Sequence, residues 1–331
     1  MKSNLLITVF FSALLFFNGY SQSGPTILCN PNTISQSLDC GDSVVMNFTV
    51  YNAGTSDLVY SPSIINNDSI KVLVFMAGVD TLQEYLNTIN IILQNNPRLI
   101  ITKFYGNDTS MLSATMAYQD ILLFPENESL GNVDYSLLSG VVNGLADKGK
   151  TVIVCGSSGL LANRIFEMNL FKGSFISNYS GFLQVNSAYQ NDPLVNQIPA
   201  TFFSATSTSE YTITNADIIP LVSNAAGNKI VFYRNVGLSK VICIGFDYFS
   251  TNPSTSKLLA NAISTAKHYE NSPRISNTGS LNILPGDSTV ISVVFNSINI
   301  EAGLHQYNLL LSSNDSAQLE LSIPIEINLN L

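Results

Sequence analysis

Residues 70–268 alternate short, apolar, β-rich runs with segments of helical period, a pattern typical of βα units around a largely parallel sheet. Residues 71–76 form a nearly continuous apolar run, as expected of a strand covered on both faces. A helix follows, with its apolar face expected at Leu82, Tyr85, Leu86, Ile89 and Leu93. Strands are also predicted at 98–104, 120–124 and 151–155, and a helix at 133–145. The chain therefore contains an α/β domain.

The second half of this domain is less regular. Residues 173–214 indicate β-structure and loops without a clear period, and strands resume at 229–233 and 240–246. A helix at 254–268 closes the unit, with an apolar stripe that includes Leu258, Leu259 and Ile263. We expect the α/β domain to span residues 69–270.

The flanking segments, 26–66 and 273–331, alternate polar and apolar residues and carry turn signals, which predicts antiparallel β-sheet. The first offers two or three strands and the last about four. Together they supply about seven strands, the complement of an immunoglobulin-like β-sandwich. The alternative is that the two flanks are unrelated β-extensions that pack separately.

Short motifs in the flanks carry a resemblance to a known family. Asn30-Pro-Asn-Thr33 and Cys40-Gly-Asp-Ser43 resemble the opening half of the immunoglobulin-like modules of the abnormal-spindle and hydin type. Leu284-Pro-Gly-Asp-Ser288 and Leu311-Ser-Ser-Asn-Asp315 resemble the closing half of the same module. The resemblance implies one immunoglobulin-like sandwich of bacterial exported proteins that is split in sequence, with the α/β domain inserted between its halves.

The α/β segment resembles the class I glutamine amidotransferase-like superfamily, and within it the ThuA-like branch. The likeness rests on Asp120-Ile-Leu-Leu-Phe-Pro-Glu126, Gly149-Lys-Thr-Val-Ile-Val-Cys155 and Val241-Ile-Cys-Ile-Gly-Phe-Asp247. It implies a flavodoxin-like, doubly wound, mostly parallel sheet. These segments are core and turn residues, so the resemblance concerns architecture rather than catalysis.

In a sheet of this kind, ligands bind beyond the carboxyl ends of the strands. The pocket is therefore expected at Gly78, Glu126, Cys155, Ser157 and Asp247.

Cys155 ends a predicted strand, near where catalytic members of the superfamily place a nucleophilic cysteine. A thiolate nucleophile needs a base or a cationic neighbour. The chain has two histidines: His268 ends the last predicted helix of the domain, and His305 lies in the C-terminal β-region. Asp192 stands where relatives often carry a histidine before proline. We therefore expect Cys155 to pack in the core or to contact a ligand, with catalysis as the weaker alternative.

Other chemistries have less support in the sequence. The segment Gly156-Ser-Ser-Gly159 is one residue short of a serine nucleophile elbow. Glu126 and Glu128 could act as an acid and base pair, although glutamates at a strand-to-helix turn are more often solvated or capping residues. No histidine pair, cysteine cluster or calcium loop has metal-binding spacing. We expect neither a metal nor a cofactor.

The first 21 residues read as a signal peptide, because Lys2 precedes an apolar run at 5–17 and a small, polar cleavage region. About 13 apolar residues are too few to span a bilayer as a helix, so no integral membrane segment is expected after cleavage. The protein is predicted to be secreted or periplasmic. A net charge of −9 with 11% charged residues disfavours nucleic acid as a partner.

Export makes disulfides possible for the four cysteines. Cys29 and Cys40 could close a short loop, whereas Cys155 and Cys243 lie in apolar runs and are expected to be buried. The alternative for all four is a reduced core residue.

These observations favour a non-catalytic extracytoplasmic binding or structural protein, in which a degenerate amidotransferase-like domain is carried on an immunoglobulin-like sandwich. Its ligand could be a protein, a glycan or a small molecule. The alternative is a hydrolase or amidotransferase-like enzyme that uses Cys155 or a carboxylate.

Overall fold

The structure is a computed structural model that describes residues 24–67, 69–96, 98–128, 133–204, 208–237, 239–265, 273–298, 300 and 302–330. The predicted signal peptide and His268 lie outside these residues. The chain divides into two compact units. The β unit is formed by the described residues up to 67 and from 273 onward, and the α/β unit by those between 69 and 265.

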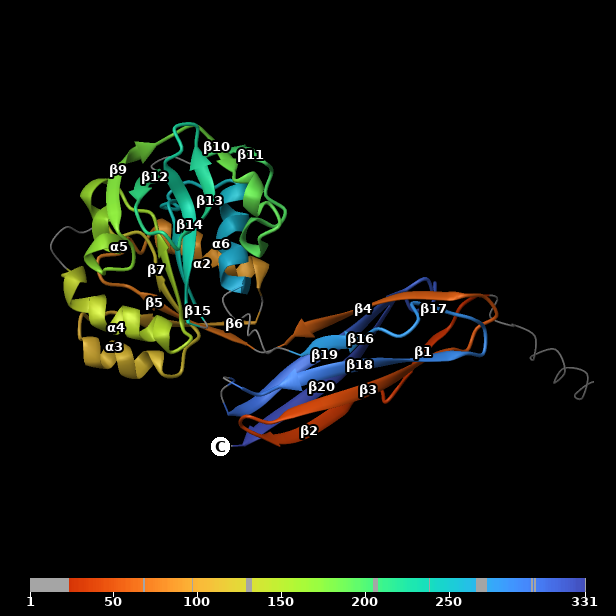
Figure 1. The fold of residues 1–331 in the computed structure, drawn as a ribbon. Coiled ribbons are helices and arrows are strands. Elements are labelled where there is room, and N and C mark those ends of the chain that lie inside the picture. Colours follow the sequence, from red (N-terminus) through yellow and green to blue (C-terminus); the bar gives the residue numbers. More distant parts are fainter. Residues whose placement is uncertain are drawn as a thin grey trace, which may run out of the picture. The chain divides into compact units, whose positions relative to one another are not determined.

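The β unit contains two sheets (Figure 1). The strands of the four-stranded sheet, in spatial order, are β1 (Ile27–Asn30), β3 (Ser43–Asn52), β18 (Ser288–Asn296) and β16 (Arg274–Asn277). Those of the five-stranded sheet are β17 (Asn282–Ile283), β4 (Leu58–Asn66), β19 (Gly303–Ser313), β20 (Glu320–Asn330) and β2 (Ile34–Asp39). The strands number nine rather than about seven, because β1, β2, β16 and β17 are too short to give a clear alternating pattern.

Strands from the two ends of the sequence pair directly. β3 pairs with β18 along its length, and β4 pairs with β19, both antiparallel. Phe48 of β3 lies opposite Ile291 of β18, and both side chains are fully buried. Val45, in the same strand as Phe48, is 59% exposed because it points to the other face.

Side chains of the two sheets contact each other. The ring centroids of Phe295 in β18 and Tyr307 in β19 lie 5.9 Å apart. The backbone N–H of Ile27 in β1 donates a hydrogen bond of 3.0 Å to the carboxylate of Asp315, which follows β19. Both chain ends thus contribute to the contacts between the sheets.

The α/β unit is built on one eleven-stranded sheet. Its parallel part has the order β6 (Leu99–Phe104), β5 (Ile70–Phe75), β7 (Ile121–Phe124), β8 (Thr151–Cys155) and β15 (Ser239–Ile244). The chain passes from β5 to β6 on one side and then returns to β7 on the other side. The predicted strands at 70, 98, 120, 151 and 240 are these five, so the mixed α/β class predicted from the sequence is confirmed.

The remaining six strands of this sheet are antiparallel. They are β14 (Lys229–Val236), β13 (Ile219–Asn224), β10 (Phe182–Val185), β11 (Thr201–Phe203), β12 (Thr208–Ile213) and β9 (Gly173–Tyr179). Short connections join β13 to β14 and β14 to β15, and such connections require antiparallel pairing. Parallel pairing is therefore confined to about half of the sheet, less than the sequence suggested.

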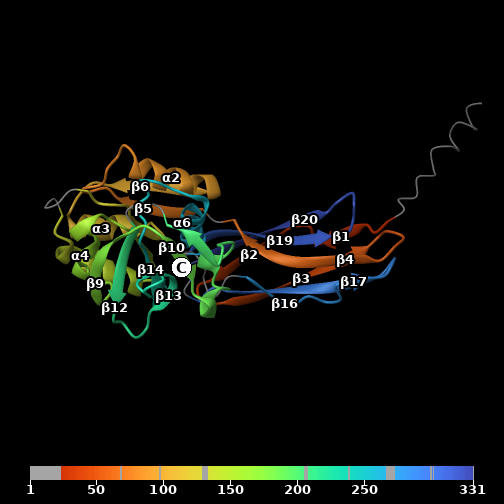
Figure 2. The same ribbon diagram turned by 90° about the horizontal axis from the view of Figure 1, so that it is seen from above.

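Helices cover both faces of the parallel strands (Figures 1 and 2). The first face packs against α2 (Glu84–Asn95) and α6 (Pro253–Thr265), and the second against α3 (Thr109–Met116), α4 (Tyr135–Asp147) and α5 (Arg164–Glu167). Three short 3₁₀ turns span Gly159–Asn163, Ser187–Tyr189 and Pro193–Val195. None of the described helices has the length and apolar character needed to cross a bilayer.

The buried face of α2 differs from the predicted one. Tyr85, Ile89 and Ile92 are buried, whereas Leu82 is 83% exposed. Leu82 precedes the helix, which begins at Glu84, so it does not share the helical period that the sequence suggested. Leu86 and Leu93 are also exposed.

Candidate functional site

The carboxyl ends of β5, β7, β8 and β15 bring together most of the residues predicted to form a pocket. Burial is nearly complete for the side chains of Glu126, Cys155, Ser157 and Asp247. The negative charges of Glu126 and Asp247 both act on the Cys155 thiol, so the three groups are neighbours. The predicted residues therefore converge, but their side chains are closed off from solvent instead of lining an open pocket.

Gly78 contributes to this region through its backbone, in the loop after β5. Its φ is +76°, in the left-handed region, and a Cβ atom at this position would lie 2.4 Å from Oδ1 of Asn127. The N–H of Glu128 donates a hydrogen bond of 2.9 Å to the carbonyl of Gly78. Glycine therefore lets the loop after β5 lie directly against the loop after β7.

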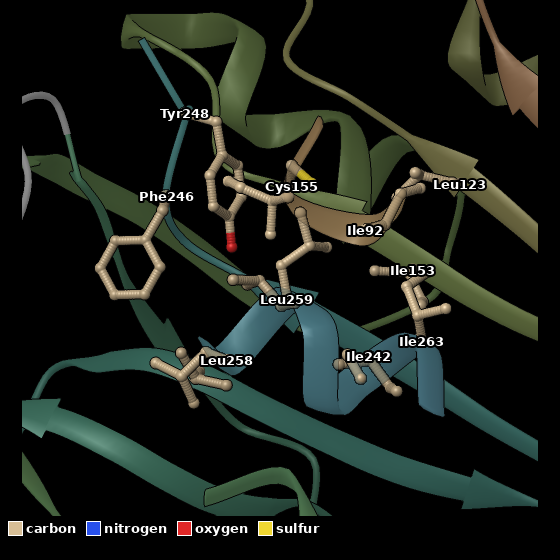
Figure 3. Packing of buried hydrophobic residues seen from close by; sticks show 14 of the residues in the cluster. Ile92, Leu123, Ile153, Cys155, Ile242, Phe246, Tyr248, Leu258, Leu259 and Ile263 are labelled. Atoms are coloured by element: carbon tan, nitrogen blue, oxygen red, sulfur yellow. The ribbon is translucent and has the colours of Figure 1, made fainter. Parts of the chain in front are cut away.

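Cys155 is part of the apolar cluster on the α2 and α6 face of the sheet (Figure 3). Its side chain is 1% exposed, and burial raises the pKa of the thiol to about 12. The nearby positive charge of Arg164 acts in the opposite direction, while Glu126 and Asp247 raise the pKa further. The thiol is therefore protonated and inaccessible at neutral pH.

The described residues of the α/β unit include no histidine that could act as a base for this thiol. His305 is buried in β19 of the β unit, and His268 lies outside the described part of the chain. Asp192 caps the 3₁₀ turn Pro193–Val195 and accepts a 2.7 Å hydrogen bond from the hydroxyl of Tyr233. Its carboxylate thus has a structural role.

Arg164 is a buried cation that the sequence analysis did not identify. Its guanidinium, 2% exposed, donates hydrogen bonds to the carbonyls of Cys155 at 2.6 Å and Gly156 at 3.4 Å. Gly156 has no room for a side chain, because a Cβ atom would lie 2.3 Å from the carbonyl oxygen of Gly245. The signal in the sequence was an arginine in the mostly apolar segment 160–166, shortly after β8.

The serines of the Gly156-Ser-Ser-Gly159 turn have structural partners. Ser157 Oγ accepts a 3.2 Å hydrogen bond from the N–H of Asn127, and its carbonyl accepts one of 2.8 Å from Ser209 Oγ. Ser158 donates from its N–H and from its hydroxyl to Glu126 Oε1, at 3.1 and 3.2 Å. These contacts join the loops after β7 and β8 and leave no serine in the arrangement of a nucleophile.

Glu126 has the most perturbed carboxyl group in this region. Burial raises its pKa to about 8, and the charges of Asp247 and Glu84 add to the effect. The charge of Arg164 and the hydrogen bond from Ser158 oppose it. The carboxyl group is therefore largely neutral at pH 7.

Glu128 does not share the environment of Glu126. It is exposed and lies beside Asp80 and Glu84, and one oxygen of each of these three residues lies within 4.8 Å of the other two. We call Asp80, Glu84 and Glu128 the carboxylate cluster. Only oxygen donors are present, which suits a hard cation. The sequence analysis missed it, although Asp80 and Glu84 are four residues apart at the start of a helix.

A separate shallow hollow of about 270 Å³ lies on the surface of α2, near the start of α6. Its lining is mostly polar and includes Asn87, Asn90, Gln94, Asn95, Thr251 and Ser256. The amide of Asn87 already donates to the carbonyl of Tyr248 at 2.9 Å.

Cys29 and Cys40, which the sequence left open as either a disulfide or two reduced residues, are both free thiols in this structure. Cys29 belongs to β1 in the four-stranded sheet, whereas Cys40 follows β2 in the five-stranded sheet. The short segment between them crosses from one sheet to the other, which the sequence pattern did not show.

The fold and the site define an α/β unit whose strand ends are closed by buried polar groups, joined to a β unit formed by both chain ends. No protein-family model matches the sequence, and a comparison with curated proteins found no match either. Solved structures with a similar fold include a ThuA-like protein from Parabacteroides merdae, with 13% identity over 60% of this chain and 90% of the other, at a TM-score of 0.44. A cytoplasmic protein from Salmonella typhimurium LT2 is similar over 60% of this chain and 100% of its own, with 9% identity and a TM-score of 0.44.

Proposed function

We propose that this chain is an exported, non-catalytic binding or structural protein. In this proposal a signal peptide at residues 1–21 is removed, and residues 26–66 and 273–331 form an immunoglobulin-like sandwich. An amidotransferase-like α/β domain of the ThuA type, residues 69–270, is inserted between them. The protein acts outside the cytoplasm, and the α/β domain has lost the catalytic centre of its relatives.

The strand arrangement supports the domain assignment. β3 pairs with β18 and β4 pairs with β19, so both sheets of the β unit need both ends of the chain. In the α/β unit, the order β6-β5-β7-β8-β15, with helices on both faces, is the strand order of doubly wound flavodoxin-like sheets.

The environment of Cys155 carries the non-catalytic assignment. A nucleophilic cysteine has a lowered pKa and is open to its substrate. The Cys155 thiol has neither property: its side chain is 1% exposed, and burial raises its pKa to about 12. The nearby cation, Arg164, donates its hydrogen bonds to the carbonyls of Cys155 and Gly156 and thereby stabilises the turn.

A carboxylate-dependent enzyme is the second candidate, and Glu126 is the observation that favours it. A carboxyl group with a pKa of about 8 beside Asp247 has the perturbation expected of a general acid. Glu126 is nevertheless buried, and Ser158 donates two hydrogen bonds to its Oε1. A proton donor must reach its substrate, so we assign Glu126 to the stabilisation of the loops.

The chemistry of the surface leaves the ligand class open among a protein, a glycan and a small molecule. The hollow on α2 presents amide and hydroxyl groups, which suit a polar, uncharged ligand.

Thiol labelling tests the proposal. We expect a thiol-directed electrophile to modify Cys40, which is exposed, quickly in the reduced, folded protein. Cys155 should react only after unfolding, because its thiol is buried and protonated. Mass spectrometry of peptides identifies the labelled residue, and a Cys40→Ser variant removes the fast reaction as a control. Rapid labelling of Cys155 in the folded protein, faster than that of Cys40, would establish the enzyme as the better assignment.

A further inference from the structure

The carboxylate cluster lies where the path of the chain changes direction on the sheet. Asp80 is in the segment after β5, Glu84 is the first residue of α2, and Glu128 is in the segment after β7. β6 and β7 flank β5 on opposite sides, so these segments leave the sheet at its topological switch point. Ligands of open α/β sheets bind at this position.

The spacing of the cluster fits one ion. Ca²⁺ binds oxygen ligands at about 2.3–2.6 Å, so two oxygens on opposite sides of the same ion are at most about 5 Å apart. The three carboxylate oxygens all lie within 4.8 Å of one another. A single cation can therefore contact all three without a change in the positions of the segments that carry them.

The cluster lacks a compensating positive charge. In the part of the chain that the structure describes, no lysine, arginine or histidine forms an ion pair with Asp80, Glu84 or Glu128. Asp80 is held in place by backbone donors, because its carboxylate accepts hydrogen bonds from the N–H groups of Leu82 at 2.8 Å and Gln83 at 3.1 Å. Three acidic groups thus lie close together, and backbone hydrogen bonds fix the position of the Asp80 carboxylate.

Glu84 provides a second, independent observation. Its side chain is 1% exposed, and its Oε2 atom is buried with no hydrogen-bond partner among the described residues. The carboxyl groups of Glu84 and Asp80 are in contact, although neither side chain has a donor when both are ionised. A buried carboxylate oxygen without a partner is costly, and buried charges in proteins are normally paired or bound to a metal.

We propose that Asp80, Glu84 and Glu128 bind one hard divalent cation, Ca²⁺ or Mg²⁺. The three carboxylates supply negative charge and oxygen donors, and the exposed side at Glu128 leaves coordination positions for water. The ion joins the start of α2 to the loops after β5 and β7. The site does not depend on the non-catalytic assignment, because neither Cys155 nor Glu126 belongs to it.

Calorimetric titration tests this site. The chelator-treated mature protein is titrated with CaCl₂ and, separately, with MgCl₂ at neutral pH, and its thermal unfolding is recorded with each salt and with chelator. We expect one bound ion per chain and a higher unfolding midpoint with the ion, because a ligand that binds only the folded state stabilises it. The relative affinity for the two ions identifies the one that the site prefers.

Three Glu→Gln variants locate the binding site. Glu128→Gln changes an exposed residue, so the protein should fold normally and bind the ion at least about tenfold more weakly. Glu84→Gln should abolish binding and raise the unfolding midpoint of the metal-free protein, because a neutral amide replaces a buried carboxyl group. Glu167→Gln, exposed on α5, is the matched control and should leave binding unchanged.

Two results would overturn the proposal. If neither cation binds or shifts the midpoint of the unmodified protein, while Glu84→Gln still stabilises it, Asp80 and Glu84 share a proton and hold no metal. If Glu84→Gln and Glu128→Gln both bind the ion as tightly as the unmodified protein, the ion binds elsewhere.

Discussion

Replacement of Arg164 by methionine should destabilise the α/β unit by about 2–4 kcal/mol at neutral pH. The methionine keeps most of the apolar contacts of the side chain but removes both hydrogen bonds to the turn after β8. A hydrogen bond from a charged donor contributes about 1.5–3 kcal/mol, and a buried carbonyl left without a donor adds to the loss. The carbonyl of Cys155, with a 2.6 Å bond to the guanidinium, should account for most of the effect.

The loss should also depend on pH because of Glu126. Its pKa is about 8 in the presence of the Arg164 charge, which favours the ionised form. Below pH 8 the carboxyl group of the variant is neutral, and the variant loses only the hydrogen bonds. Without the Arg164 charge the pKa of Glu126 is higher in the variant. As the pH rises above 8, the carboxyl group ionises beside its cation in the unmodified protein but stays protonated in the variant, so the difference in stability between the two proteins should widen. In a double variant with Glu126→Gln, this additional loss of stability should disappear. The loss that Arg164→Met causes below pH 8 should remain unchanged.

Urea unfolding of the α/β unit, followed at several pH values, measures both effects. Arg98→Met is the control, because Arg98 is an exposed arginine in the same unit. A loss below about 1 kcal/mol for Arg164→Met would refute the reasoning, because it is smaller than one charged hydrogen bond. A pH-independent loss would show that Arg164 does not interact with Glu126.

Two further predictions concern the β unit and export. Phe48→Ala should destabilise the β unit by about 3–5 kcal/mol, because Phe48 is buried. Val45→Ala should cost less than about 0.5 kcal/mol, because Val45 is exposed. Chemical unfolding of both variants measures the two losses, and equal losses would contradict the shared core. N-terminal sequencing of exported protein should find a mature chain that begins near Gln22 or Ser23, and recovery of intact Met1 in the cytoplasmic fraction would contradict export.

The parallel strands were the part of the fold that could be predicted from sequence. Segments such as Ile121–Phe124 and Thr151–Cys155 are buried on both faces, and this leaves a continuous apolar run. The individual strands within 173–214 could not be predicted, because strands such as Gly173–Tyr179 are largely exposed and rich in polar residues. In such strands, tertiary pairing and not side-chain pattern decides the structure.

The sequence indicated where the site residues lie on the sheet, but not that their side chains are buried. In the structure Glu126, Cys155, Ser157 and Asp247 lie at the carboxyl ends of the strands, where the sequence placed them, and their side chains are buried. A sequence does not show whether side chains at a strand end face solvent or one another, so the burial of these groups could not be foreseen. The carboxylate cluster was missed because Glu128 is far from Asp80 and Glu84 in sequence, and only the adjacency of β5 and β7 brings it near them.

The pairing of β3 with β18 imposes an order on the biogenesis of the protein. The hydrogen bond between the side chains of Ser292 and Asn47 joins residues that are 245 positions apart in the chain. During synthesis β2, β3 and β4 emerge long before their partners β20, β18 and β19, whereas the α/β unit is complete before β18 exists. Until then the unpaired edges of β3 and β4 could associate with other chains. A chain of this design therefore gains from a holding chaperone that covers its N-terminal strands.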